Sequence, residues 1–70
     1  MELKDKLFLA SKAFDKGWDY ETLMYGDDLY NYSGEERDKI LDEVWEYVDE
    51  ISENGIRAFK EEYKDFKLYF

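Results

Sequence analysis

The stretch that decides the fold is SGEERDKILDEVWEYVDEISE, residues 33–53. Its apolar residues recur at intervals of three and four, the spacing of one face of an α-helix. They are Ile40, Leu41, Val44, Trp45, Val48 and Ile51. Ser33 and Glu36 match a capping box, in which the serine accepts from a first-turn amide and the glutamate reaches back to the cap amide. The pattern predicts a helix over about 34–53, roughly 30 Å long.

The residues before this stretch predict two further helical segments. An apolar stripe at steps of four and three predicts a helix over about 2–16; it consists of Leu3, Leu7, Ala10 and Phe14. Gly17 stands where a left-handed residue would end that helix. Asp19 can then cap a short helix near 20–25, after which Gly26-Asp27-Asp28 indicates a turn.

The residues after the stretch leave two alternatives open. Asn54-Gly55 can end the long helix in a left-handed conformation, or Gly55 can lie inside a continuous helix at a cost of about 1 kcal/mol. A last helix over about 56–66 is predicted by a second apolar stripe; its members are Ile56, Phe59, Tyr63 and Phe66. The tail, residues 66–70, alternates apolar and other residues, so a short strand is the alternative there.

These elements predict one small all-α domain over residues 1–70, a bundle of three main helices with a short helix near 20–25. A chain of 70 residues has room for a single modest core. Aromatic residues make up 20% of the chain, so each buried side chain can remove a large area from water.

The chain contains neither cysteine nor histidine. The usual zinc, haem and iron-sulfur ligand sets are therefore missing, and so are the common pairs of nucleophile and base. The acidic run 27–38 lacks the order of a calcium loop, and no glycine-rich phosphate loop occurs. We therefore expect no enzyme activity, no metal and no cofactor. No signal-peptide or membrane-spanning pattern is present at the N-terminus, so we expect a cytoplasmic protein.

The net charge of −9 is concentrated in one part of the chain. Residues 1–17 and 56–70 each sum to +1, from four bases and three acids, whereas residues 18–55 hold 13 acids and two bases, a net of −11. A phosphate backbone would be repelled by such a block, so direct binding to nucleic acid is disfavoured. The asymmetry predicts an acidic face directed at a basic protein surface.

Nine acidic residues lie on the predicted long helix, opposite its apolar stripe. They are Glu35, Glu36, Asp38, Asp42, Glu43, Glu46, Asp49, Glu50 and Glu53. Over about 27 Å of helix this is roughly one charge per 3 Å, although Arg37 and Lys39 neutralise part of the first turn. One strand of B-form DNA carries a charge about every 3.4 Å, so a groove shaped for a phosphate backbone could accept this helix.

The alternative explanation is that an acid-rich outer face only keeps a small protein soluble. Two features argue against it. Asp42, Glu46 and Glu50 place like charges four residues apart, which mildly destabilises a helix. Asp42 and Asp49 are also poorer helix formers than glutamate. Helix stability was therefore not the only criterion that shaped this face.

The irregular stretch before the long helix mixes acidic and aromatic residues. Its acids are Asp19, Glu21, Asp27 and Asp28, and its rings are Trp18, Tyr20, Tyr25, Tyr30 and Tyr32. Tyrosine and tryptophan dominate the energetic centres of protein interfaces, so this mixture is typical of a protein-binding loop. We expect Trp18 and Trp45 to lie in the core, and Tyr30 and Tyr32 to be exposed and available to a partner.

Small size, concentrated acidity and richness in Lys, Asp, Tyr and Phe resemble phage-encoded inhibitors of bacterial defence systems, notably anti-CRISPR proteins and other DNA mimics. One stretch, AFDKGWDY at residues 13–20, is similar to an Ala-Phe, Gly-Trp, acidic-aromatic stretch in a small acidic Cas9-inhibitor family. It covers eight of the 70 residues. The resemblance implies that the chain occupies a DNA-reading site on a nuclease, such as the pocket that recognises the motif beside the target.

Three functions follow as hypotheses. The first is a phage-type inhibitor that occupies the basic nucleic-acid channel of a defence nuclease, in the host cytoplasm if it is phage-encoded. The second is a small adaptor or regulator that docks through its aromatic patch. The third is a structural or assembly protein of a virion. In each case the expected partner is a protein rather than nucleic acid or a membrane, and a homodimer is left open.

Overall fold

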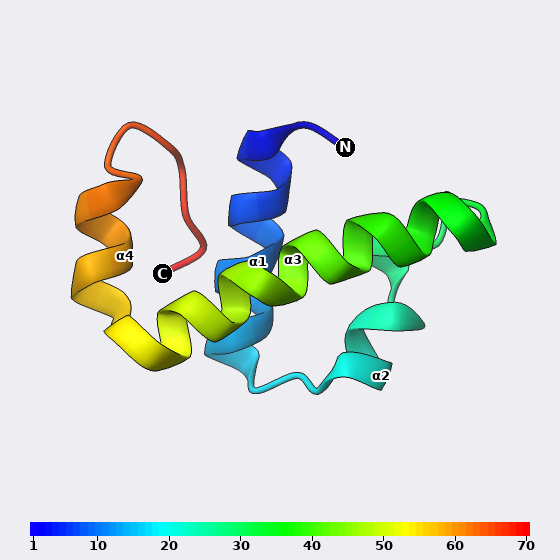
Figure 1. The fold of residues 1–70 in the computed structure, drawn as a ribbon, viewed down its shortest axis with the longest axis horizontal. Helices are drawn as coiled ribbons and strands as arrows, with labels where there is room; N and C mark the ends of the chain where they lie inside the picture. The colour runs from blue at the N-terminus through cyan, green and yellow to red at the C-terminus, as the bar shows by residue number, and fades with distance from the viewer.

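The computed structural model describes all 70 residues, 1–70, and every regular element in it is a helix (Figure 1). In chain order these are α1 (Leu3–Lys16), α2 (Tyr20–Met24), the 3₁₀ helix η1 (Asp27–Leu29), α3 (Gly34–Asn54) and α4 (Ile56–Glu62). The molecule measures 33 × 21 × 16 Å, and α3, at about 31 Å, spans its longest dimension. The predicted all-α class is confirmed.

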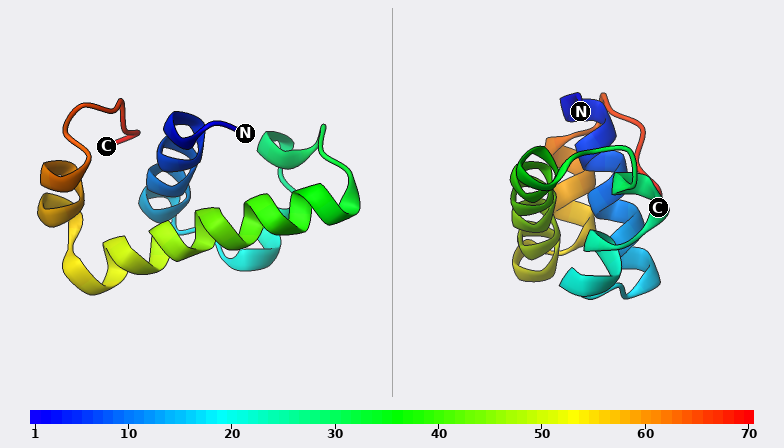
Figure 2. Two further views of the ribbon diagram at one scale, coloured as in Figure 1. Left: turned by 45° about the horizontal axis from the view of Figure 1, so that its top comes forward. Right: turned by 90° about the vertical axis from the view of Figure 1, so that its right-hand side faces the viewer.

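The long helix α3 is the element on which the others are arranged. α1 crosses it near its middle, with α2 and η1 on one side of α1 and with α4 and the C-terminal tail, residues 66–70, on the other (Figures 1 and 2). α1 therefore has neighbours on both flanks. The core is divided accordingly into two clusters, one on each side of α1.

The first cluster joins α1 to α2, η1 and the N-terminal two thirds of α3. Its buried members are Leu9, Ala10, Ala13, Leu23, Leu29, Ile40, Leu41, Val44 and Val48. Trp18 and Trp45, predicted to lie in the core, are partly buried and pack against this cluster. Each also has a polar or aromatic neighbour: Lys12 Nζ lies over the Trp18 ring, 5.4 Å from its centroid, and the Tyr20 ring meets Trp45 edge-on.

The second cluster joins α1 to the end of α3, α4 and the tail. Only Leu7, Ile51 and Phe59 are fully buried in it. Around them pack partly buried side chains, most of them aromatic: Phe14, Tyr47, Tyr63, Phe66, Leu68 and Phe70. This region contains few aliphatic residues, so large rings from α4 and the tail supply most of its buried apolar area.

The C-terminal tail is extended but is not a strand. Its alternate side chains pack against the second cluster and are partly buried: Phe66, Leu68 and Phe70. Lys67 and Tyr69, between them, are exposed, so the alternation in the sequence separates the side of the tail that faces the core from the side that faces solvent. The tail runs alongside α1 and is held there by one backbone-to-side-chain hydrogen bond, in which the Tyr69 amide donates to Ser11 Oγ at 2.7 Å (Figure 1). The alternative of a short strand is wrong because the neighbour of the tail is a helix, which offers no ladder of free backbone groups.

The end of α1 follows the sequence prediction. Gly17 is left-handed, with φ 70° and ψ 29°, and its amide donates to Phe14 O while the Trp18 amide donates to Ala13 O at 2.9 Å. These two bonds form a Schellman cap, which satisfies carbonyls at the helix end. Asp19 then caps α2, accepting from the Thr22 amide at 2.8 Å.

Gly55 separates α3 from α4, so the alternative of one continuous helix is wrong. Its φ of 93° and ψ of 160° do not form the expected left-handed cap, but an extended conformation with positive φ. That region is essentially open to glycine alone. α4 begins at the next residue and ends at Glu62, not near residue 66, because a turn that bonds the Phe66 amide to Tyr63 O directs the chain back toward α1.

The start of α3 differs in one detail from the predicted capping box. Ser33 is the N-cap residue, with extended φ −74° and ψ 165°, but its side chain makes no capping bond. Its carbonyl accepts from the Arg37 amide at 2.6 Å, which begins the helical ladder. Gly34, Glu35 and Glu36 are exposed, so solvent can satisfy the free amides of the first turn.

Candidate acidic interface

Six exposed carboxylates form a straight row along the outside of α3. Their positions advance by three or four residues at each step, 18 residues in five steps, which matches the helical period of 3.6. They therefore lie within an arc of about 80°. We call these residues the outer row: Glu35, Asp38, Asp42, Glu46, Asp49 and Glu53. All six are among the nine acids predicted to lie opposite the apolar stripe of this helix.

The row has a lower charge density than the nine acids of the helix taken together. Because one turn of helix rises about 5.4 Å, the row carries one carboxylate per about 5.4 Å of axis. The phosphates of one DNA strand follow one another about every 3.4 Å. The close match inferred from the sequence is therefore wrong for the row, which can place charges at only some of the phosphate positions of a strand.

The other three acids of α3 lie to one side of the row. Glu36 is exposed, whereas Glu43 and Glu50 are partly buried. Glu43 accepts a hydrogen bond from Lys6 Nζ of α1, and this bond lowers the pKa of the Glu43 carboxyl. Glu43 therefore joins α3 to α1 within the fold.

Glu50 lies where α3 faces α4. Its Oε2 atom is buried and has no hydrogen-bond partner. Burial raises the pKa of Glu50, and the negative charge of Glu62 on α4 adds to the effect. Burial also raises the pKa of the nearby Tyr63 hydroxyl, with the charges of Glu50 and Glu62 acting in the same direction. This corner of the molecule therefore disfavours further negative charge.

Replacing Glu50 with glutamine should raise the melting temperature by a few degrees at pH 7. The folded-state pKa lies above the unfolded-state pKa, so ionised Glu50 destabilises the fold at every pH above the folded-state value. The penalty disappears as the pH falls below the unfolded-state pKa of about 4.3. Thermal unfolding of E50Q and the parent chain should therefore differ at pH 7 and coincide near pH 4.

Glu46→Gln is the matched control, since it removes the same charge from an exposed position one turn earlier. At pH 7 its melting temperature should rise by less than that of E50Q, through relief of the repulsion by Asp42 and Glu50 alone. Equal shifts in the two variants at pH 7 would show that general charge repulsion, and not the burial of Glu50, causes the effect.

The two cations of the long helix do not neutralise the row equally. Arg37 lies about 140° around the helix from the middle of the row. It is partly buried, and its Nε atom is buried without a partner. Lys39 is exposed at about 60° from the middle of the row. Arg37 thus points toward the body of the protein, and only Lys39 borders the row.

Tyr20 connects α2 to the row, a contact that was not predicted from the sequence. Its hydroxyl donates to Asp42 Oδ1 at 3.1 Å, and its ring meets Trp45 edge-on with centroids 5.7 Å apart. Burial raises the pKa of Tyr20, and the bond to Asp42 adds to this. The contact orients the Asp42 carboxylate, but no local pattern pairs residues 22 positions apart in the chain.

The four acids of the α2–η1 region have different roles. Hydrogen bonding to the Thr22 side chain, together with the capping bond from the Thr22 amide, lowers the pKa of Asp19. Asp28 Oδ1 lies 3.5 Å from Lys12 Nζ, which ties η1 to α1. Glu21 and Asp27 are exposed and make no recorded ion pair or side-chain hydrogen bond.

The exposed tyrosines of this region differ in part from those predicted. Tyr30 is 78% exposed, as expected, but Tyr32 is partly buried against the first core cluster. Tyr25, which was not among the predicted binding residues, is 75% exposed. Tyr25 and Tyr30 therefore form the exposed aromatic pair of this region. Their contact with a partner stays a prediction, as does that of the outer row.

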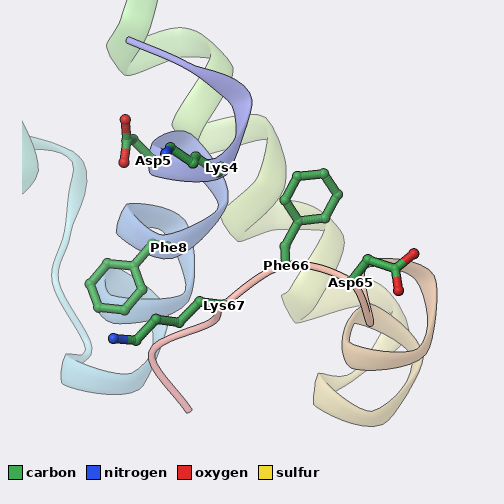
Figure 3. A pocket seen from close by; sticks show the side chains of 6 residues that line it. All are labelled: Lys4, Asp5, Phe8, Asp65, Phe66 and Lys67. Atoms are coloured by element: carbon green, nitrogen blue, oxygen red, sulfur yellow. The ribbon is translucent and has the colours of Figure 1, made fainter.

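The one pocket of the molecule lies elsewhere. It has a volume of about 450 Å³ and lies between α1 and the start of the tail, with α3 behind it (Figure 3). Its lining mixes two lysines, two aspartates and two phenylalanines: Lys4, Lys67, Asp5, Asp65, Phe8 and Phe66. Lys67 Nζ lies 6.0 Å from the Phe8 ring centroid. No residue of the predicted binding set lines this pocket.

No family model, curated protein or solved structure matches this chain. No helix combines the length and the apolar character that crossing a bilayer requires. The stretch 13–20, which carries the resemblance to Cas9 inhibitors, spans the end of α1 and the start of α2. Gly17 and Asp19 of that stretch have structural roles as helix caps.

Proposed function

We propose that this protein is a phage-type inhibitor of a bacterial defence nuclease, with a Cas9-like nuclease as the favoured target. In this proposal α3 enters a basic groove that otherwise binds DNA, and the outer row meets the lysines and arginines of that groove. The observation that carries the proposal is the row itself, six exposed carboxylates on one side of a 21-residue helix.

The packing of α3 supports this function because it fixes the row in place. Leu41, Val44 and Ile51 on the opposite side of the helix are fully buried. The carboxylates are thus presented on a rigid element, and less conformational entropy is lost on binding. Asp42 and Glu46, both in the row, repel each other at four-residue spacing, and a cationic groove would relieve that repulsion.

Long-range electrostatic attraction would increase the rate at which the protein binds such a groove. The net charge of −11 over residues 18–55 would steer the chain toward a positively charged channel and accelerate their encounter. Since the row reproduces only some phosphate positions, complementary contacts from neighbouring elements are also needed. The α2–η1 region, which adjoins α3 through Tyr20, is the nearest source of such contacts.

The test reverses three charges in the middle of the row, Asp42→Lys, Glu46→Lys and Asp49→Lys. We expect this variant to lose inhibition of a Cas9-type defence, measured as phage plating on a bacterial host that carries the defence system. The variant changes the net charge from −9 by +6, to −3. Unchanged inhibition would refute the proposal.

A matched control separates the position of the charges from their total. Glu2→Lys, Glu61→Lys and Asp65→Lys also bring the net charge to −3, but these exposed residues lie outside the row. The control variant should keep most of its inhibition. Equal loss in both variants would mean that overall acidity, and not the row, is required. Circular dichroism should show that both variants remain helical.

The second candidate function is an adaptor or regulator that docks through the α2–η1 region. The observation that favours it is the exposure of Tyr25 and Tyr30, 75% and 78%. In that case Tyr25→Ala with Tyr30→Ala should abolish binding to the partner, and added salt should have little effect. A steep loss of affinity with salt would favour the inhibitor, because exposed charge pairs are screened.

A further inference from the structure

The exposed tyrosines Tyr25 and Tyr30 lie at the two ends of η1. Tyr25 caps the end of α2, and Tyr30 follows the last residue of η1. They are five positions apart in the chain, so their Cα atoms are at most about 17 Å apart. Leu23 and Leu29, beside them, are buried and hold this corner to the core. The two rings contribute little to the fold and remain open to a partner.

Each of these tyrosines has an exposed carboxylate one turn before it. The Tyr25 amide donates to Glu21 O at 3.0 Å, which places the two residues one α-helical turn apart, where side chains are neighbours. The Tyr30 amide donates to Asp27 O at 3.3 Å in the 3₁₀ turn. In that geometry residues three apart are eclipsed, so Asp27 and Tyr30 project from the same side. The same arrangement of carboxylate and ring thus occurs twice.

No cation of the chain neutralises these two pairs. Between Lys16 and Arg37 there is no lysine or arginine. Lys12 of α1 pairs with Asp28 and lies over the Trp18 ring. The carboxylates of Glu21 and Asp27 are therefore free to bind a cation from outside.

We infer that the α2–η1 corner binds two arginine side chains of the partner, one at Glu21 with Tyr25 and one at Asp27 with Tyr30. A guanidinium group is planar, donates two parallel hydrogen bonds to a carboxylate and stacks on an aromatic face. A lysine ammonium has no plane to stack and no fork to match a carboxylate. The inference rests on the proposed function, since it names the chemistry of the partner beside the outer row.

The test compares two peptides of equal charge, acetyl-GRGGGRG-amide and acetyl-GKGGGKG-amide, in NMR titrations of the ¹⁵N-labelled protein. The arginine peptide should bind several-fold more tightly than the lysine peptide and should shift the amide signals of residues 21–30. In Tyr25→Leu with Tyr30→Leu this preference should fall to about one. Tyr25→Phe with Tyr30→Phe, which keeps both rings, should retain it.

Two results would overturn the inference: equal affinity of the wild-type protein for both peptides, or an unchanged arginine preference in the double leucine variant. A variant of the row, Asp42→Asn, Glu46→Gln and Asp49→Asn, should bind both peptides more weakly but keep the preference. The proposed function fails independently, if reversal of the row leaves nuclease inhibition intact. The two failures are thus distinguished by separate variants and separate measurements.

Discussion

Replacing Phe59 with alanine should lower the free energy of unfolding by about 3–5 kcal/mol. A domain of 70 residues has a total of roughly 4–10 kcal/mol, so this single change removes much or all of it. The variant should therefore be largely unfolded or molten at 37 °C. No other position in the second cluster combines so large a side chain with so little exposure, 1%.

The expected size of the effect follows from the contacts of the ring. Phe59 meets three other aromatic rings, with centroid distances of 4.8 Å to Tyr63 and 6.4 Å to both Tyr47 and Phe70. Removing it leaves a cavity between α3, α4 and the tail that these large side chains cannot fill without moving off their rotamers. The tail would also lose its principal apolar contact on α4.

Urea denaturation followed by tryptophan fluorescence and circular dichroism measures this prediction. Tyr25→Ala is the control, because it also removes an aromatic ring but at a position that is 75% exposed. Its free energy of unfolding should change by less than about 0.5 kcal/mol. A small effect of Phe59→Ala, similar to that of the control, would mean that the second cluster contributes little to stability.

Gly55→Ala should destabilise the protein by about 1–3 kcal/mol. A Cβ atom at Gly55 would meet nothing within 4 Å, so no clash opposes the change. The whole effect comes from the backbone, which at φ 93° and ψ 160° occupies a region that residues with a side chain rarely adopt. Relaxing that strain would change the direction in which α4 leaves α3.

Gly34→Ala is the matched control for the same substitution. Gly34 begins α3 without a positive φ, and a Cβ atom there would also meet nothing within 4 Å. Alanine should be neutral or stabilise the helix by up to about 1 kcal/mol. Gly55→Ala should therefore lower the denaturation midpoint, whereas Gly34→Ala should raise it or leave it unchanged. Equal destabilisation would contradict the role assigned to the Gly55 backbone.

The helices could be predicted from the sequence because their signals are local. The apolar stripe of residues 40–51 and the caps at Gly17 and Asp19 depend only on neighbours within a few residues. The tail could not be predicted, because its conformation depends on α1. Alternation alone indicates extended backbone, and the absence of a partner strand follows from a contact between Tyr69 and Ser11, 58 residues apart.

The candidate site shows the same limit. All six residues of the outer row follow from helical spacing, but the pattern does not reveal that Lys6 engages Glu43 or that Glu50 faces Glu62. The exposure of Tyr25 and the burial of Tyr32 depend on how η1 packs against α1, which a single sequence does not encode as a local period. The charge pattern thus predicts which face of the helix is acidic, whereas tertiary packing determines which side chains beside that face are exposed.

The bond between Tyr69 and Ser11 also has a consequence for biosynthesis. A ribosome releases the chain from its N-terminus, so α1 emerges long before the residues that cover one of its flanks. The first cluster can assemble once α3 is available, whereas the second, which contains Leu7, also needs Phe59 of α4 and the tail side chains Phe66, Leu68 and Phe70. The second cluster should therefore be the last part of the fold to assemble, because the tail that completes it follows every other element in the chain.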